Sequence, residues 1–307
     1  MAGKKLISVM IPTYNCAHFL RKTIESVLDQ DLGEATMQIE VIDDCSTDDP
    51  EAIVALYGRG RVSFFRQDQN VKHVKNFQTA IERAEGDIIH LLHGDDYVLP
   101  GFYTSMIKMY EDFPQIKACF SRHFFVDENS DIITVSRLEK NQNGIFEDFF
   151  HEIILDQHIQ TPSITVRKEV YQTLGTFNPT LTWTEDWEMW TRIAMHYPFG
   201  YIKEPLACYR MHNNSSTGTK TITGENVNDL MRIQKIFLGY ADSQELKDKV
   251  VDSFRKNILG NALKNYSLSK KDHKEHALQH LKIVENYSGS FLQKIKVRLI
   301  ALKFRFS

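Results

Sequence analysis

In the first hundred residues, short apolar runs alternate with segments whose apolar residues recur at the spacing of a helix. Four of these runs predict strands, at residues 6–11, 38–42, 62–65 and 87–92. A buried helical stripe between the first two strands is predicted by Leu20, Ile24, Val27 and Leu28. Asp49 followed by Pro50 predicts the start of a second helix, and residues 73–84 predict a third. The alternation predicts an α/β fold, a mostly parallel, Rossmann-like sheet flanked by helices.

Composition narrows the class of protein. The chain has 307 residues, 42% of them hydrophobic, enough for one large domain with an appendage. Its formal charge of -3 gives no overall attraction to nucleic acid, so no nucleic-acid partner is expected. No apolar stretch has the length of a spanning helix. The four cysteines are scattered without zinc or disulfide spacing, which favours a reducing, cytoplasmic location.

The character of the chain changes near residue 220. We expect residues 1–220 to form the α/β domain and residues 221–307 to form a helical C-terminal region. The tail at residues 291–307 combines large apolar side chains with five basic residues and no acidic ones. This composition suits a helix lying on an anionic membrane, and it suits equally a helix docked on the protein or on another subunit.

Polar side chains follow three of the predicted strands, in loops at residues 12–15, 43–49 and 93–96. In open α/β sheets the ligand binds beyond the carboxyl ends of the strands, so these loops are expected to meet there. A single Asp-Asp pair is more often a turn or a helix cap. Pairs on successive strand ends favour a nucleotide and a divalent cation instead.

Five segments in order resemble the family 2 glycosyltransferases of the GT-A fold, such as those that build bacterial surface polysaccharides. They are residues 7–15, 39–48, 86–96, 184–190 and 209–212. The resemblance implies an inverting enzyme that moves a sugar from a nucleoside diphosphate donor, usually with Mn²⁺ or Mg²⁺. It also implies a role for individual residues of this chain.

The first two loops correspond to donor-binding positions of the family. In the first loop these are Pro12, Thr13, Tyr14 and Asn15. Thr13 and Tyr14 are expected to frame the base, whereas Asp43 or Asp44 would accept a hydrogen bond from the base edge or the ribose. Capping of the turn that follows is the alternative role for the second residue of that pair.

The third loop and two basic positions are expected to meet the diphosphate. By similarity, Asp95 contacts the ribose and metal-bound water, and Asp96 is the direct metal ligand. His212 is expected near the metal or the diphosphate, with a surface or structural role as the alternative. Lys75 could reach the diphosphate or be simply solvated. The family usually has Gly near the position of Lys72, which leaves the backbone conformation there open.

The remaining motif carries the expected catalytic base. Asp186 corresponds to the family's base, which takes the proton of the acceptor hydroxyl during attack on the anomeric carbon. Alternatively, Glu185 and Asp186 only favour the positive end of a helix dipole. Trp183 and Glu185 are expected to contact the acceptor, whereas Trp187 and Trp190 could instead pack in the core.

We therefore expect a hexosyltransferase that moves a sugar, most simply from a UDP-sugar, to a hydroxyl of a glycan or lipid-linked glycan. It would act in the cytoplasm or peripherally on the inner face of the cell membrane, and self-association stays open. A non-catalytic nucleotide-sugar or glycan binding module on the same fold is the alternative. A nucleotidyltransferase is more distant, because no glycine-rich phosphate loop is found.

Overall fold

A computed structural model of the chain describes residues 5–212, 216–270, 274–287 and 294. The chain divides into two compact units. The first contains residues 1–153, 157–179 and 186–211, and the second contains residues 154–156, 180–185 and 212–307.

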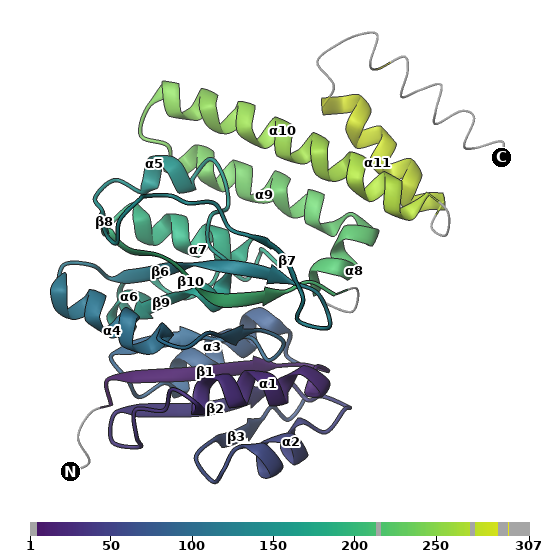
Figure 1. Ribbon diagram of the computed structural model, residues 1–307. Coiled ribbons are helices and arrows are strands. Elements are labelled where there is room, and N and C mark those ends of the chain that lie inside the picture. The colour runs from purple at the N-terminus through teal and green to yellow at the C-terminus, as the bar shows by residue number, and fades with distance from the viewer. Residues whose placement is uncertain (1–4, 213–215, 271–273, 288–293, 295–307) are drawn as a thin grey trace. The chain divides into compact units, whose positions relative to one another are not determined.

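The first unit begins with the predicted alternation of strands and helices (Figure 1). Its strands are β1 (Ile7–Thr13), β2 (Met37–Asp43), β3 (Ser63–Arg66) and β4 (Ile88–Leu91). They are parallel to one another, in the order β3-β2-β1-β4. The helices between them are α1 (Ala17–Leu28), α2 (Pro50–Tyr57) and α3 (His73–Arg83). The predicted elements of this half are thus confirmed, with ends shifted by a few residues.

Beyond β4 the sheet becomes mixed. The order continues through β9 (Ile164–Arg167), β6 (Ala118–Val126), β10 (Phe199–Arg210) and β5 (Tyr97–Val98). The outer strands β7 (Ile132–Val135) and β8 (Gly144–Phe146) pair with β6 and β10. The helices of this half are α4 (Phe102–Asp112), α5 (Phe150–Ile153), α6 (Lys168–Leu174) and α7 (Glu185–Ala194).

The core of this unit lies between the parallel strands and the helices that cover them. Every residue of β1 and of β2 is buried, as expected of central strands covered on both faces. The predicted stripe on α1 is buried with them, and Asp49 caps α2 by accepting a hydrogen bond from the N–H of Ala52. Burial of this apolar surface fixes the sheet and therefore the positions of the loops at its edge.

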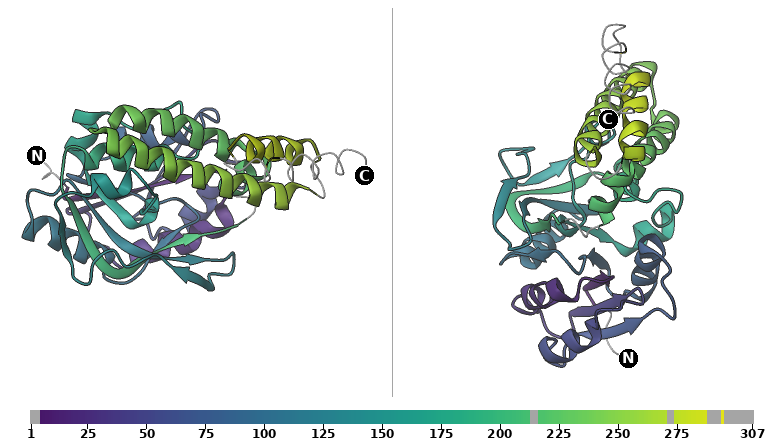
Figure 2. Two further views of the ribbon diagram at one scale, coloured as in Figure 1. Left: turned by 90° about the horizontal axis from the view of Figure 1, so that it is seen from above. Right: turned by 90° about the vertical axis from the view of Figure 1, so that its right-hand side faces the viewer.

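The second unit is helical, which confirms the predicted C-terminal appendage. It contains α8 (Ser216–Thr223), α9 (Glu225–Tyr240), α10 (Gln244–Ser269) and α11 (Lys274–Tyr287). Helix α10 packs against both α9 and α11, shown as green and yellow ribbons in Figure 2. Its buried stripe begins with Leu246, Val250, Phe254 and Ile258, and Phe254 meets Phe237 of α9 with 5.8 Å between ring centroids.

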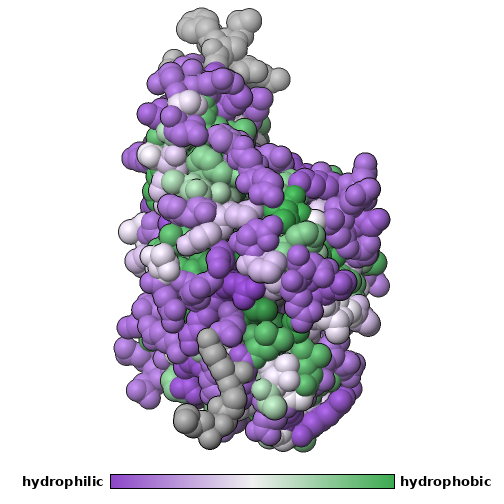
Figure 3. Space-filling model, turned by 90° about the vertical axis from the view of Figure 1, so that its left-hand side faces the viewer, coloured by the Kyte–Doolittle hydropathy of each residue, from purple (hydrophilic) through white to green (hydrophobic). Residues whose placement is uncertain are grey.

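The face drawn in Figure 3 is largely hydrophilic, and hydrophilic side chains break up the apolar areas on it. Across the described part of the chain, none of the helices combines the length and apolar character needed to cross a membrane. Of the predicted membrane or docking helix at residues 291–307, all but residue 294 lie outside the described residues.

Candidate active site

The carboxyl ends of β1, β2 and β4 are joined by backbone hydrogen bonds. The N–H of Asp44 donates to the carbonyl of Thr13 at 2.9 Å, and the N–H of Gly94 donates to the carbonyl of Pro12 at 3.1 Å. These bonds hold the three polar loops at one edge of the sheet. The predicted convergence of the loops is therefore confirmed.

Gly94 allows the third loop to lie directly on the first. A Cβ at this position would lie 2.6 Å from Oγ1 of Thr13 and 3.0 Å from Sγ of Cys16. A larger residue at this position would have to displace the side chains of Thr13 and Cys16. Asp95 and Asp96 follow Gly94 directly in the chain.

Asp96 is a buried carboxylate in which only one of the two oxygens accepts a hydrogen bond from the described residues. Its side chain is 1% exposed, and Oδ1 accepts a hydrogen bond from the N–H of Arg210 at 2.8 Å. Oδ2 has no hydrogen-bond partner among the described residues, and its ion-pair neighbour is Nδ1 of His93 at 3.7 Å. Burial, together with the neighbouring Asp95, raises the pKa of Asp96 well above its ordinary value. A buried oxygen in this state is costly unless a positive charge compensates it.

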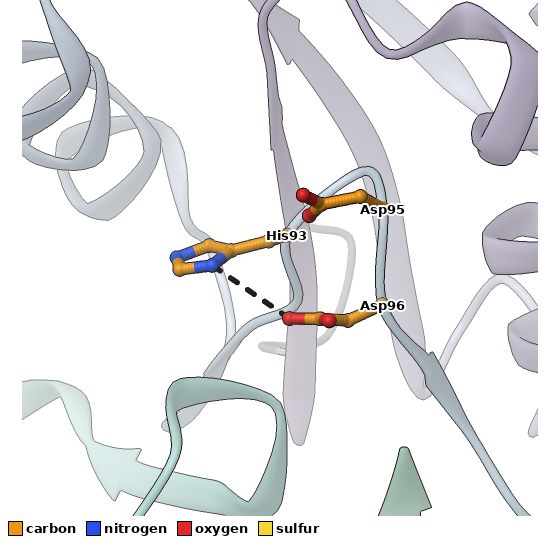
Figure 4. Close-up of side chains that lie close together, drawn as sticks. All are labelled: His93, Asp95 and Asp96. Atoms are coloured by element: carbon orange, nitrogen blue, oxygen red, sulfur yellow. Dashed lines mark ion pairs between the residues drawn. The ribbon is translucent and has the colours of Figure 1, made fainter. Parts of the chain in front are cut away.

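His93, Asp95 and Asp96 lie close enough to share one cation (Figure 4). One ligand atom from each lies within 4.8 Å of the others. Carboxylate oxygens are the ligands that Mg²⁺ and Mn²⁺ prefer, and the unsatisfied Oδ2 of Asp96 fits that use. His93 was not among the expected ligands, although it immediately precedes the Gly-Asp-Asp motif. Its ring stacks on Phe77 of α3, with 5.0 Å between centroids.

A second group of possible metal ligands consists of Glu139, Glu152 and His158. The guanidinium of Arg137 pairs with Glu139 at 2.7 Å and also contacts His158. Positive charge is thus already supplied by the chain there. Of these two groups, the turn at the end of β4 is therefore the better candidate for a cation site.

Arg210, the last residue of β10, ties the Asp95–Asp96 turn in place. Its N–H donates to Asp96, and its side-chain Nε donates to the carbonyl of Asp95 at 2.8 Å. The guanidinium also lies 4.5 Å from the ring centroid of Phe19 in α1. This positive charge opposes the effect of burial on the pKa of Asp96. The sequence motif contained Arg210, but nothing in the motif indicated this contact.

The same guanidinium holds the turn between β6 and β7. Nη1 of Arg210 donates to the carbonyls of Asp127 and Glu128, both at 2.9 Å, and to Oγ of Ser130 at 3.0 Å. Planar, branched donors of this kind are specific to arginine. One side chain thus links the β6–β7 turn to the predicted metal ligands.

We expect Arg210→Lys to weaken Mn²⁺ binding by about tenfold, because a lysine cannot make these divergent bonds. The free energy of unfolding should fall by about 2 kcal/mol, from the loss of buried charged hydrogen bonds. Isothermal titration with Mn²⁺ and urea denaturation measure the two effects.

Arg61→Lys is the matched control, because Arg61 also bonds an acid and a backbone carbonyl, those of Asp31 and Met37, at the start of β2. It should lose stability and keep its Mn²⁺ affinity. An Arg210→Lys variant with unchanged affinity would contradict the linking role.

The two adjacent acids of the second loop, Asp43 and Asp44, make different contacts. Asp43 is fully buried, and its carboxylate accepts from the N–H and the hydroxyl of Ser46 and pairs with Arg66 at 3.3 Å. Asp44 is also buried, and its Oδ1 accepts from the N–H of Val71 at 2.7 Å. Burial raises the pKa of Asp44, which this bond partly offsets. The turn is thus capped by Asp43, whereas the sequence had suggested Asp44 for this role. Asp44 instead binds the segment before α3.

The first loop offers one exposed aromatic ring. Tyr14 is 50% exposed, whereas Pro12 and Thr13 are buried in the junction of the strands. Asn15 has a left-handed φ of 49°, and its Oδ1 accepts a hydrogen bond from the N–H of Thr47 at 2.9 Å. Asn15 therefore connects the first loop to the second, and the base contacts assigned to this loop stay predictions.

Lys72, where the family usually has glycine, adopts a backbone conformation that suits glycine. It precedes α3 with φ 73° and ψ 156°. This region is almost closed to residues with a Cβ and costs about 1–3 kcal/mol. Lys75, in the first turn of α3, is exposed. Its predicted contact with the diphosphate stays a prediction.

We expect Lys72→Gly to raise the free energy of unfolding by about 1 kcal/mol, because relief of strain exceeds the added entropy of the unfolded chain. Urea denaturation measures this change. Lys75→Gly is the control, since the same substitution inside the helix should cost about 1 kcal/mol. Destabilisation by both variants would show that the backbone at Lys72 is not strained.

Asp186, the expected base, stands in the first turn of α7. Its Oδ1 accepts from the N–H of Trp187 at 2.6 Å, and its Oδ2 accepts from Nε2 of Gln157 at 3.0 Å. Gln157 lies in an irregular segment that carries no recognisable motif. Trp187 and Trp190 are buried, and Nε1 of Trp187 donates to the carbonyl of Ile153, so these two residues are part of the core.

The other predicted residues, Trp183, Glu185 and His212, belong to the second unit. Trp183 and His212 are partly exposed, and Glu185 is buried. Their roles toward acceptor and metal stay predictions.

Comparison with known proteins identifies the family of this chain. Residues 8–175 match the family model described as glycosyl transferase family 2. An uncharacterized glycosyltransferase of Methanocaldococcus jannaschii is 29% identical over 217 residues, which cover 69% of this chain and 73% of that protein. An uncharacterized protein of Mycobacterium tuberculosis is 26% identical over 244 residues, covering 75% of each chain.

Two solved structures share the fold. S. aureus TarS in complex with UDP-GlcNAc has a TM-score of 0.69 at 17% identity, covering 92% of this chain and 80% of that one. A mannosyltransferase from Pyrobaculum calidifontis, in complex with GDP-Man and Mn²⁺, has a TM-score of 0.59 at 15% identity, covering 99% and 83%. The α/β architecture with its C-terminal helices is that of the GT-A glycosyltransferases. On the family match, which extends over more than half of its length, this chain belongs to glycosyl transferase family 2.

Proposed function

We propose that this glycosyltransferase is an inverting enzyme that uses a nucleoside diphosphate sugar and a divalent cation. The observation that carries the proposal is the buried Oδ2 of Asp96, which lacks a hydrogen-bond partner among the described residues and lies beside Asp95 and His93. Asp96, with these neighbours, would hold the cation. When bound, Mn²⁺ or Mg²⁺ supplies positive charge that stabilises the departing diphosphate.

Two fold neighbours support the class of donor. TarS was solved with UDP-GlcNAc, and the P. calidifontis mannosyltransferase was solved with GDP-Man and Mn²⁺. We propose a UDP-sugar as the donor, with Tyr14 offering its exposed ring to the base. Lys75 and His212 are proposed to meet the diphosphate or the metal.

The chemical step needs one proton acceptor. Asp186 takes the proton of the acceptor hydroxyl while that oxygen forms a bond to the anomeric carbon. The bond from this carbon to the diphosphate breaks, and its electron pair leaves with the phosphate oxygen. A single displacement inverts the anomeric centre and needs no covalent intermediate on the chain. Gln157 and the N–H of Trp187 would orient the carboxylate.

The acceptor is proposed to be a hydroxyl of a glycan or lipid-linked glycan, contacted by Trp183 and Glu185. We propose a cytoplasmic enzyme in cell-envelope polysaccharide synthesis that binds the inner face of the membrane through residues 291–307, whose five cations favour anionic lipid. Deletion of these residues should lower sedimentation with phosphatidylglycerol vesicles and leave turnover of a soluble acceptor unchanged. Unchanged sedimentation would refute the anchor and favour docking on protein.

Release of nucleoside diphosphate from a panel of nucleotide sugars, with Mn²⁺ or with EDTA, tests the proposed reaction. We expect one donor to be turned over, and EDTA to stop the release. A folded chain that binds donor but never releases nucleoside diphosphate, with water or with any acceptor, would support the binding module instead.

A further inference from the structure

A buried carboxylate in the C-terminal helices binds the loop that leads into the expected base. Asp229 of α9 is fully buried. Its Oδ2 accepts hydrogen bonds from the backbone N–H groups of Thr182, Trp183 and Thr184 at 3.0, 2.8 and 2.9 Å. The hydroxyl of Thr184 donates to the same oxygen at 3.0 Å. Three consecutive N–H groups thus converge on one oxygen.

This arrangement is more than a single capping bond. Consecutive N–H groups form a concave site for an anion, and the carboxylate of Asp229 occupies that site. Its other oxygen pairs with Nη1 of Arg232 at 3.0 Å, so the buried charge is compensated on both sides. Loss of the carboxylate would leave three backbone donors without this acceptor, which is costly for buried groups.

A side chain from a second helix also binds this loop. Nζ of Lys220 in α8 donates to the carbonyl of Thr182. The N–H groups of residues 182–184 are therefore bound by Asp229, and the carbonyl of Thr182 is bound by Lys220. Both side chains come from the helical C-terminal region.

We propose that Asp229 is a positioning residue for the catalytic base. It fixes residues 182–184, and Thr184 is separated from Asp186 by a single residue, so displacement of this loop would move the base. Catalysis is sensitive to such displacement, since a shift of about 1 Å can lower the rate by about 100-fold. The inference rests on the proposed function, in which Asp186 takes the acceptor proton.

The test compares Asp229→Asn, which keeps an acceptor oxygen without the charge, with Asp229→Ala, which removes the acceptor. Turnover is measured as release of UDP from UDP-GlcNAc and of GDP from GDP-mannose with Mn²⁺. We expect the turnover number to fall by about tenfold in the first variant and by about 100-fold in the second. The affinities for UDP and GDP with Mn²⁺ should stay within about twofold of those of the wild type. Hydrogen exchange at residues 182–184 should become faster in both variants.

Asn265→Ala is the matched structural control. Asn265 is a buried polar residue of α10, and its Nδ2 donates to Asn226 of α9 at 2.7 Å. The substitution should destabilise the same helices without changing turnover or exchange at residues 182–184. If Asn265→Ala lowers turnover as much as Asp229→Ala does, the effect is general destabilisation and the inference is overturned.

A double variant separates positioning from structural damage. In the Asp186→Asn background, Asp229→Asn should cause no further loss of turnover, because the group that it positions is already disabled. Additive losses would overturn the inference. If Asp186→Asn itself is fully active, the proposed function fails. If Asp186→Asn is inactive and Asp229→Ala is fully active, only the positioning role fails.

Discussion

Asp96→Asn is expected to weaken Mn²⁺ binding by more than about 100-fold, beyond the usual effect of losing a supporting residue. Donor binding that depends on Mn²⁺ should be lost with it. The substituted side chain keeps the shape of Asp96 and an oxygen for the N–H of Arg210, so the turn should stay folded. Isothermal titration with Mn²⁺ alone, and then with UDP or GDP in the presence of Mn²⁺, measures both effects.

Asp112→Asn is the control for this substitution, because Asp112 is an exposed acid paired with Lys108 on α4. It should bind Mn²⁺ as the wild type does. Unchanged Mn²⁺ affinity in Asp96→Asn would remove Asp96 from the metal site.

The metal-free protein should show a related dependence of stability on pH. Burial raises the pKa of Asp96 in the folded chain, so the folded state binds a proton over a pH range in which the unfolded chain has released it. The free energy of unfolding therefore falls as pH rises through that range. Asp96→Asn should lack this decline, and Mn²⁺ should reverse it in the wild type. Urea denaturation across pH, with and without Mn²⁺, tests this.

Asp186→Asn is expected to lower turnover by about 100-fold to 10,000-fold, the usual contribution of a positioned general base. Binding of Mn²⁺ and nucleoside diphosphate should stay within about twofold, because the proposed base would act on the acceptor. The bond from the N–H of Trp187 can be kept by the asparagine oxygen, which limits structural damage. Donor titration and the rate of nucleoside diphosphate release, measured on the same preparation, separate the two properties.

Glu169→Gln serves as the control, because Glu169 is an exposed acid that pairs with Lys117. Loss of donor binding in Asp186→Asn, or turnover equal to that of the wild type, would be incompatible with the role of Asp186.

The sequence predicted the parallel half of the sheet and the meeting of its loops, because both follow from local periodicity and from the rules of α/β folds. The mixed half could not be predicted in this way. There β6 pairs with β9 and β10, strands that lie far along the chain from it. Such pairings depend on which surfaces pack together rather than on the pattern within one segment.

The residues of the candidate site could likewise be predicted only in part. The Gly-Asp-Asp turn was found from its position after a buried strand, but the hydrogen bond to Oδ1 of Asp96 comes from Arg210, which lies 114 residues away. Residue type also failed to separate Asp43 from Asp44, because their different roles depend on Ser46, Arg66 and Val71.

Contacts that follow no sequence pattern could not be predicted. Gln157 lies in an irregular segment, and Asp229 looks like one more acid on the polar face of a helix. Their partners become visible only when the chain is folded. Lys72 is the opposite case, because its departure from the family's glycine marked the position where the backbone proved unusual.

The central claim is that Asp96 holds the cation that assists departure of the nucleoside diphosphate. Anomalous diffraction from crystals grown with Mn²⁺ and UDP or GDP tests it most directly. We predict a single strong manganese peak in contact with Oδ2 of Asp96, beside Asp95 and bridged to the diphosphate. A peak at Glu139, Glu152 and His158 with none at Asp96, or nucleotide bound at the strand ends without manganese, would contradict the claim.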